Sequence, residues 1–118
     1  MAKILVVDDS KLTRMILVNT LQEGGFTVIQ AENAKEGLEL FKKENPDLVL
    51  TDLIMPGIDG IQMAQDIRKR NPKVPIILNS VEFNKEVKLR SQKVGINDYL
   101  FKDFEKKELI KKVKALLV

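Results

Sequence analysis

Short apolar runs alternate with longer amphipathic segments along the whole chain, and this alternation is the feature that most constrains the fold. Residues 4–7 are Ile-Leu-Val-Val and residues 48–51 are Leu-Val-Leu-Thr, without the apolar–polar alternation of half-exposed strands. Continuous runs of this kind predict strands that are buried on both faces. Three more strands are predicted at residues 26–30, 75–79 and 98–101. Strands covered on both faces require helices above and below the sheet.

The segments between the strands have helical periodicity. In the first, Leu12, Met15, Ile16 and Leu21 occur at helical spacing, and Gly24-Gly25 is a helix stop. Five β-then-α units predict an α/β domain with a parallel sheet and right-handed crossovers. The predicted helices cover residues 11–23, the segment from the cap Asn33 to Asn45-Pro46, the segment from Ile61 to Asn71-Pro72, and residues 84–94 and 105–117.

Composition and charge limit the possible classes of function. The 118 residues fit one domain, 1–118, and the absence of cysteine and histidine leaves carboxylates to bind any metal, which favours Mg²⁺, Mn²⁺ or Ca²⁺. The net charge is +3, but the lysines are densest on the last predicted helix, where a solvated amphipathic face is the simpler interpretation. Met1-Ala2-Lys3 does not begin a signal peptide, and no apolar run approaches the roughly 20 residues that cross a bilayer. We therefore expect a cytoplasmic protein that does not contact membranes.

Polar residues collect at the carboxyl ends of four predicted strands. Asp8-Asp9 follow the first, Asp52 the third, Ser80 the fourth and Lys102 the fifth. Each has an ordinary explanation as a helix cap, a turn residue or a surface lysine. Together they fall on the edge where open α/β sheets bind ligands. Three carboxylates at neighbouring strand ends repel one another unless a cation intervenes, so we expect a Mg²⁺ site.

A carboxylate beside such a cation can accept a phosphoryl group and form an aspartyl phosphate. Phosphoryl transfer depends mainly on positioning and on neutralising the phosphoryl oxygens. Lys102 is the candidate cationic partner, and the Ser80 hydroxyl is a candidate hydrogen-bond donor to one oxygen.

Four blocks of sequence carry a resemblance to the receiver domains of two-component response regulators. They are Val6-Val7-Asp8-Asp9-Ser10, the segment Leu-Thr-Asp-Leu-Ile-Met-Pro-Gly at residues 50–57, Asp59-Gly60 and Tyr99-Leu100-Phe101-Lys102. The resemblance spans essentially the whole chain. It implies a flavodoxin-like, doubly wound five-stranded parallel sheet of order 2-1-3-4-5 with five helices.

The resemblance also implies roles for single residues. Asp52 resembles the aspartate that accepts a phosphoryl group from a sensor histidine kinase or phosphotransfer protein. Asp8, Asp9 and Asp52, with the backbone carbonyl of Ile54, match the ligands of Mg²⁺, for which Mn²⁺ can substitute. Lys102 matches the lysine that pairs with the phosphate, and Ser80 and Tyr99 match the switch pair. The implied output is a changed affinity for a protein partner at the face formed by the fourth helix, fifth strand and fifth helix. Such a protein is a phosphoacceptor switch whose only chemistry is its own phosphorylation and autodephosphorylation.

Two positions depart from the family pattern. Asp103 follows Lys102 where receiver domains usually have a proline in a cis peptide, so we expect a trans or strained bond and an acid that competes for the lysine. Val81 replaces a small residue after Ser80 and is expected to narrow access to Asp52. Ile54 and Glu82 stand where relatives control water access to the acyl phosphate. Because Ile54 cannot orient a water molecule, we predict slow autodephosphorylation.

There are three alternatives to the phosphorylation switch: a constitutive interaction module, a flavin-binding electron carrier and a nucleic-acid-binding protein. The protein could be a constitutive interaction module with the same fold and no regulated phosphorylation. A flavin-binding electron carrier would share the architecture, but Asp8-Asp9-Ser10-Lys11 has the wrong charge for a phosphate loop. Direct nucleic-acid binding is not expected, because no helix-turn-helix pattern is present. The cognate kinase, the output partner, the oligomeric state and whether the chain belongs to a longer regulator are not encoded in any recognisable pattern.

Overall fold

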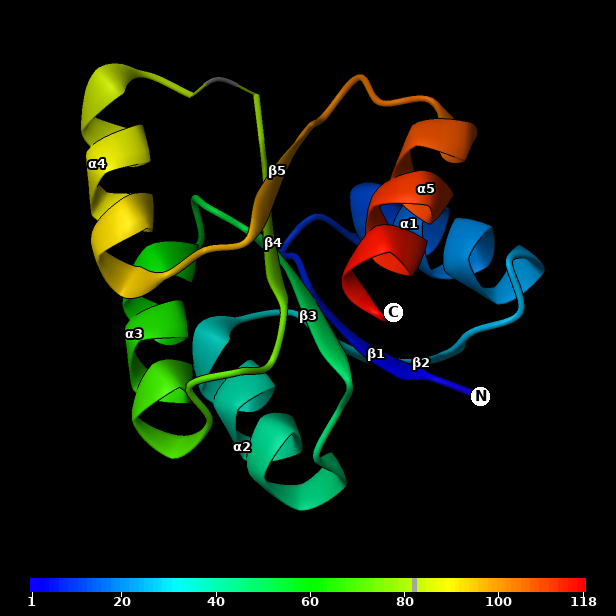
Figure 1. Ribbon diagram of the computed structural model, residues 1–118, viewed down its shortest axis with the longest axis horizontal. Coiled ribbons are helices and arrows are strands. Elements are labelled where there is room, and N and C mark those ends of the chain that lie inside the picture. Colours follow the sequence, from blue (N-terminus) through cyan, green and yellow to red (C-terminus); the bar gives the residue numbers. More distant parts are fainter. Residues whose placement is uncertain (82) are drawn as a thin grey trace.

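The computed structural model describes residues 1–81 and 83–118, and within them the chain forms five strands and five helices in strict alternation (Figure 1). The elements are β1 (Lys3–Val7), α1 (Lys11–Glu23), β2 (Thr27–Ala31), α2 (Ala34–Glu44), β3 (Leu48–Asp52), α3 (Gly60–Arg70), β4 (Ile76–Ser80), α4 (Lys85–Val94), β5 (Asp98–Phe101) and α5 (Lys106–Leu116).

The five strands form one parallel sheet of order β2-β1-β3-β4-β5, which confirms the predicted fold class. Helices α1 and α5 cover one face, and α2, α3 and α4 cover the other (Figure 1). Every residue of β3 and of β4 is buried, as expected of central strands between two helical layers. The end of β3 lies between the ends of β1 and β4. The strand order reverses between β1 and β3, because β2 is added on one side of β1 and β3 on the other.

Side-chain alternation along the strands divides the core into two layers. Ile4, Val6 and Leu50 pack beneath α1 and α5, whereas Leu5 and Val49 pack against α2 and α3. A smaller cluster around Leu53, Ile61, Leu78 and Val87 joins α3 and α4 to the end of the sheet. Because side chains alternate along each strand, the strand also determines toward which face of the sheet the side chain of the next residue points.

The helix ends follow local chemistry. Asn33 and Asn84 cap α2 and α4 through their side chains, and Asn45 ends α2 in the left-handed conformation with a φ of 47°. The strand predictions are displaced by one residue at most: β2 begins at Thr27 rather than at Phe26, and β4 at Ile76 rather than at Pro75.

The apolar spacing in the first helix did not identify its buried face. Leu12, Met15 and Ile16 are 70%, 49% and 45% exposed, whereas Leu17 and Leu21 are buried. The helix has two apolar stripes, and the one that lies over the sheet is set by how α1 packs beside α5. The exposed stripe follows directly after Asp8-Asp9.

Candidate functional site

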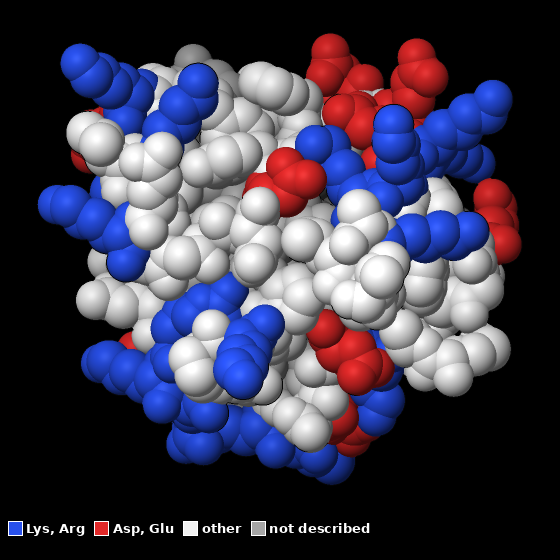
Figure 2. All heavy atoms as spheres, viewed as in Figure 1, with Lys and Arg blue, Asp and Glu red and all other residues white. Residues whose placement is uncertain are grey.

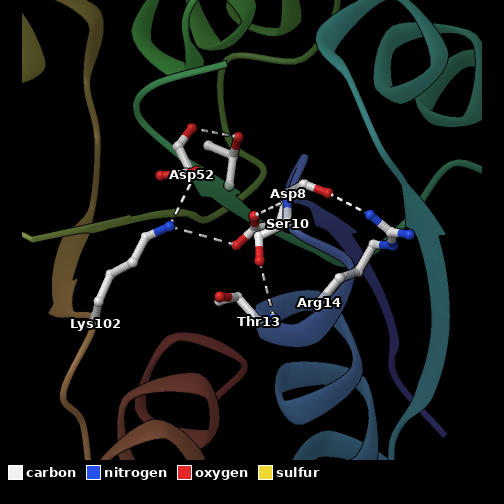
Figure 3. Close-up of polar contacts among 7 residues, drawn as sticks. Asp8, Ser10, Thr13, Arg14, Asp52 and Lys102 are labelled. Atoms are coloured by element: carbon white, nitrogen blue, oxygen red, sulfur yellow. Dashed lines mark hydrogen bonds and ion pairs between the residues drawn. The ribbon is translucent and has the colours of Figure 1, made fainter. Parts of the chain in front are cut away.

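The polar residues predicted from strands one, three and five meet at the carboxyl edge of the sheet (Figure 3). Asp8 and Asp9 follow β1, Asp52 ends β3, and Lys102 follows β5. Carboxylate oxygens of Asp8, Asp9 and Asp52 all lie within 4.8 Å of one another. Asp8 and Asp52 are 0% and 6% exposed, and Asp9 is exposed. The result is an acid pocket with two buried walls and one side open to solvent.

Hydrogen bonds hold Asp8 at the entrance to α1. The Ser10 amide donates to Asp8 Oδ1 at 2.9 Å, and Ser10 Oγ accepts from the Thr13 amide as the N-cap of the helix. Arg14 donates from Nη1 to the Asp8 backbone carbonyl at 2.7 Å and from Nε to Gln30 at 3.0 Å. Arg14 is thus directed at the backbone of Asp8 and ties the β1–α1 connection to β2.

The backbone of Asp52 is held between β3 and α3. Its carbonyl accepts a hydrogen bond from the Thr51 hydroxyl at 2.9 Å. The first residue of α3, Gly60, lies so close to this carbonyl that an added Cβ would overlap it. The Gly60 amide also donates to the Leu53 carbonyl at 2.8 Å. Glycine at this position therefore lets α3 begin directly against the strand that carries Asp52.

The start of α3 is also joined to α4. Asp59 accepts from the Gln62 amide while Gln62 Oε1 accepts from the Asp59 amide, both at 2.8 Å, which is a capping box. The second carboxylate oxygen of Asp59 accepts from Arg90 of α4 at 2.8 Å. From the sequence, Asp59 was identified only as part of the Asp59-Gly60 block and Arg90 was not identified, although the Asp59–Gln62 spacing is a recognisable N-cap signal.

The Lys102 ammonium lies between the two buried acids (Figure 3). Its Nζ is 3.0 Å from Asp52 Oδ2 and 3.7 Å from Asp8 Oδ2. Burial nevertheless raises the pKa of both carboxyl groups above the ordinary value of 3.8, because one ammonium does not fully offset the desolvation of two neighbouring acids. The pocket therefore carries an excess of negative charge that a further cation would neutralise.

The donor set fits a hard divalent cation. Asp8 Oδ2 is buried, and within residues 1–81 and 83–118 it accepts no hydrogen bond. Carboxylate oxygens with one side open to water match the preference of Mg²⁺ for a few protein oxygens and retained waters. Ile54 follows Asp52 by two residues and is 70% exposed.

The remaining predicted residues lie nearby but in different surroundings. Ser80 is buried at the end of β4, and its carbonyl accepts from the Lys102 amide at 3.0 Å. Tyr99 is half-buried and packs edge-on against Phe83 at a centroid distance of 4.7 Å, away from the acids. Phe83 also packs edge-on against Phe101, with a distance of 5.0 Å between the ring centroids. This aromatic cluster was not anticipated from the sequence.

The structure also bears on the two departures from the family pattern. The Lys102–Asp103 peptide bond is trans. The expected competition by Asp103 was wrong: across the described ranges the ion pairs of Lys102 are with Asp8 and Asp52, and Asp103 is exposed. Val81 is 68% exposed and lines a hollow with Phe101, Lys102 and Asp103. Glu82, the other residue connected with water access, lies outside the described residues.

Comparison with known proteins identifies the family. Residues 4–114 match the model of the response regulator receiver domain. This chain belongs to the response regulator receiver domain family. The receiver is 34% identical to the protein PilH of Pseudomonas aeruginosa over 99% of this chain and 98% of that protein. Its structure superimposes on the chemotaxis protein CheY4 of Vibrio cholerae with a TM-score of 0.96, 31% sequence identity and 99% coverage of both chains.

Other relatives are longer than this receiver. It is 38% identical to the probable transcriptional regulator ycf27 of Porphyridium aerugineum and 36% identical to the transcriptional regulatory protein ResD of Bacillus subtilis. The match covers 98% of this chain in both cases, but only 48% of each relative, so the chain spans about half their length.

Because the chain belongs to the receiver domain family, the acid pocket can be compared with what receiver domains do. Receiver domains of two-component response regulators are phosphoacceptor switches that bind Mg²⁺ at an acidic pocket and interact with kinases and downstream effectors. In the part of the chain that the structure describes, the acidic residues that could hold a metal ion are Asp8, Asp9 and Asp52. Over the same part, no helix has the length and apolar character needed to cross a membrane.

Proposed function

We propose that residues 1–118 form one receiver domain that accepts a phosphoryl group on Asp52 from the phosphohistidine of a sensor histidine kinase or phosphotransfer protein. The observation that carries this proposal is the Asp52 carboxylate itself. It is buried, lies 3.0 Å from Lys102 and shares a pocket with two other acids. Crowded acids reduce stability, which is consistent with a site that is kept for chemistry.

The transfer exchanges one bond to phosphorus for another. A carboxylate oxygen of Asp52 forms the new P–O bond as the P–N bond to the donor imidazole breaks, and the imidazole leaves with the electron pair and takes up a proton. Lys102 exchanges its contact with the Asp52 carboxylate for a contact with a phosphoryl oxygen. Ser80, on the adjacent strand, donates its hydroxyl to another oxygen. The reaction therefore needs no histidine within this chain.

Asp8, Asp9 and Asp52 would hold the divalent cation, together with the backbone carbonyl of Ile54. When bound, Mg²⁺, or Mn²⁺ in its place, supplies positive charge to the phosphoryl oxygens. The Ser10 and Arg14 hydrogen bonds orient Asp8 for this role before any ligand arrives.

Once formed, the aspartyl phosphate is expected to persist. Ile54, two residues after Asp52, is exposed and apolar, so its side chain cannot orient an attacking water molecule. We predict a half-life well above seconds in Mg²⁺ buffer, and a half-life of seconds would contradict the assignment of Ile54.

The output surface in this proposal is the face formed by α4, β5 and α5. A hollow of about 280 Å³ in this face is lined by one residue of α4, three of β5, two of α5 and one that precedes α4: Lys88, Asp98, Tyr99, Phe101, Glu108, Lys112 and Phe83. Aromatic side chains such as these are enriched in the centres of protein–protein interfaces. A hydrogen bond from Ser80 to the phosphoryl group would leave space toward which Tyr99 moves, changing this face.

We do not expect this domain to bind nucleic acid directly. In the view of Figure 2, lysine and arginine side chains gather along the lower edge, over α2 and α3, while acidic and uncharged residues separate those elsewhere on this face. Sequence-specific binding would also need a reading element, and no helix-turn-helix pattern is present in the sequence.

A constitutive interaction module remains the second candidate, favoured only by Val81 and Asp103, which line a hollow beside Lys102. Addition of beryllofluoride with Mg²⁺ separates the two functions. A switch changes the fluorescence of Tyr99, which is the only tyrosine, whereas a static module leaves it unchanged.

Phosphorylation by acetyl phosphate tests the proposal directly. The native protein should incorporate one phosphoryl group in Mg²⁺ and none in EDTA, and Asp52→Asn should lose incorporation by at least about 100-fold. Asp66→Asn, an exposed acid on α3, is the matched control and should react normally. Normal labelling of Asp52→Asn would show that the proposal is wrong.

A further inference from the structure

Asn79 is a polar residue inside the sheet. Its exposed fraction is 0%, and every residue of its strand, β4, is buried. Within residues 1–81 and 83–118, neither the amide nitrogen nor the carbonyl oxygen of its side chain has a hydrogen-bond partner. A buried amide without hydrogen bonds destabilises a protein, so its presence in a fully buried strand calls for an explanation.

The position of Asn79 places it beside Asp52. In the parallel register Asp52 pairs with Asn79, and Asn79 pairs with Leu100. Residues paired in this way lie about 4.8 Å apart on the same face of the sheet. Leu50, Ile77 and Leu100 belong to the core beneath α1 and α5, and alternation places Asp52 and Asn79 on that side too.

Buried side-chain atoms without a hydrogen bond concentrate around Asp52. There are four such side-chain atoms in the described part of the chain: Asp8 Oδ2, both polar atoms of Asn79, and Ser91 Oγ. Three of the four therefore flank Asp52, with Asp8 on the β1 side and Asn79 on the β4 side. Lys102 follows Leu100 by two residues, so it leaves β5 on the face that Asn79 shares. The proposed cation explains Asp8, but nothing in that role explains Asn79.

We propose that Asn79 is a positioning residue of the acid pocket, whose side-chain amide holds the Asp52 carboxylate and the Lys102 ammonium through hydrogen bonds completed by water. The proposal rests on the function assigned to Asp52. A neutral amide suits this position because its nitrogen donates to a carboxylate and its oxygen accepts from an ammonium. A buried water with polar neighbours completes such networks at low cost.

A matched pair of substitutions separates positioning from packing. Asn79→Val and Asn79→Thr introduce side chains of nearly the same shape, and only threonine keeps a hydrogen-bonding group. We expect the maximal rate of phosphorylation by acetyl phosphate to fall about 10-fold in Asn79→Val and less than about threefold in Asn79→Thr. The half-saturating acetyl phosphate concentration should stay unchanged, because Asn79 does not touch the phosphodonor. Equal maximal rates in the native protein and both variants would overturn the proposal.

Thermal unfolding in EDTA gives a second readout that does not depend on activity. Asn79→Val should raise the Tm by several degrees more in the Asp52→Asn background than in the native background. In the native background, the stability gained by removing a buried amide is offset by the stability lost when the Asp52–Lys102 ion pair is no longer supported. An identical Tm change in both backgrounds would show that Asn79 is merely tolerated. If Asn79→Val does not fold, Asn79→Ala is compared with Asn79→Thr instead.

Failure of this inference is distinguishable from failure of the proposed function. Normal labelling of Asp52→Asn by acetyl phosphate would overturn the function. Loss of labelling in Asp52→Asn, combined with a native rate in Asn79→Val, would overturn only the role of Asn79.

Discussion

Two lysine–aspartate pairs of this receiver have similar geometry but different surroundings. Lys102 lies 3.0 Å from Asp52, and Lys112 lies 3.2 Å from Asp98. The two lysine side chains are 24% and 26% exposed, but the aspartate side chains are 7% and 35% exposed. Burial raises the pKa of Asp52. The two pairs therefore differ in the burial of the acid and not in the distance between the charged atoms, and this burial distinguishes the acid pocket from an ordinary surface ion pair.

The largest difference is expected when each lysine loses its charge. Lys102→Gln should lower the free energy of unfolding in EDTA by about 2–4 kcal/mol, because it leaves Asp8 and Asp52 buried without a cation. Millimolar Mg²⁺ should restore part of this loss. Urea denaturation with and without Mg²⁺ measures both effects. A loss below about 0.5 kcal/mol would mean that the pocket behaves like a surface pair.

Neutralising an acid should have opposite signs in the two regions. Asp8→Asn should raise the free energy of unfolding in EDTA by about 1–2 kcal/mol, because desolvation is the largest cause of its raised pKa. Asp98→Asn should lower it slightly, because Asp98 also accepts from the Tyr99 amide. Isothermal titration calorimetry should show weaker Mg²⁺ binding for Asp8→Asn alone. Destabilisation by Asp8→Asn would contradict the predicted sign.

The dependence of stability on pH follows from the raised pKa values of Asp8 and Asp52. Because both exceed the ordinary 3.8, the folded protein binds more protons than the unfolded chain between that value and the folded pKa. The contribution of these groups to stability is therefore lost as the pH rises through the folded pKa. Lowering the pH in EDTA from neutral toward 3.8 should therefore raise the free energy of unfolding, because both groups take up protons more readily in the folded protein. The Asp8→Asn/Asp52→Asn double variant is the reference, and an equal slope in both proteins would remove the basis of this prediction.

The smallest effect is expected for the half-buried pair of Lys112 and Asp98. Lys112→Gln should change the free energy of unfolding by about 0.5 kcal/mol or less, since water screens a pair of this kind. The phosphorylation rate should stay unchanged, because Lys112 and Asp98 belong to the aromatic hollow rather than to the acid pocket. Parallel denaturation and acetyl phosphate assays on Lys102→Gln and Lys112→Gln complete the comparison.

Much of the fold was predictable because its signals are local. The buried runs at β3 and β4, the caps Asn33 and Asn84 and the five β-then-α units are visible in neighbouring residues. The face of α1 was not predictable, because its two apolar stripes are equivalent until α1 packs beside α5. The contacts of Arg14, Gly60 and Arg90 were missed for a related reason: their partners lie on other elements.

For the acid pocket, the sequence by itself determined which groups are present and at which edge of the sheet they lie. Parallel strands carry their carboxyl ends to one edge, so Asp8, Asp9, Asp52 and Lys102 had to be neighbours once the strands were recognised. Only the tertiary structure decided how these charges are balanced. The Lys102 ammonium turns toward Asp8 and Asp52 instead of Asp103, and Asn79 falls in register with Asp52. Both outcomes depend on burial and strand register, which are properties of the assembled sheet and not of any single segment.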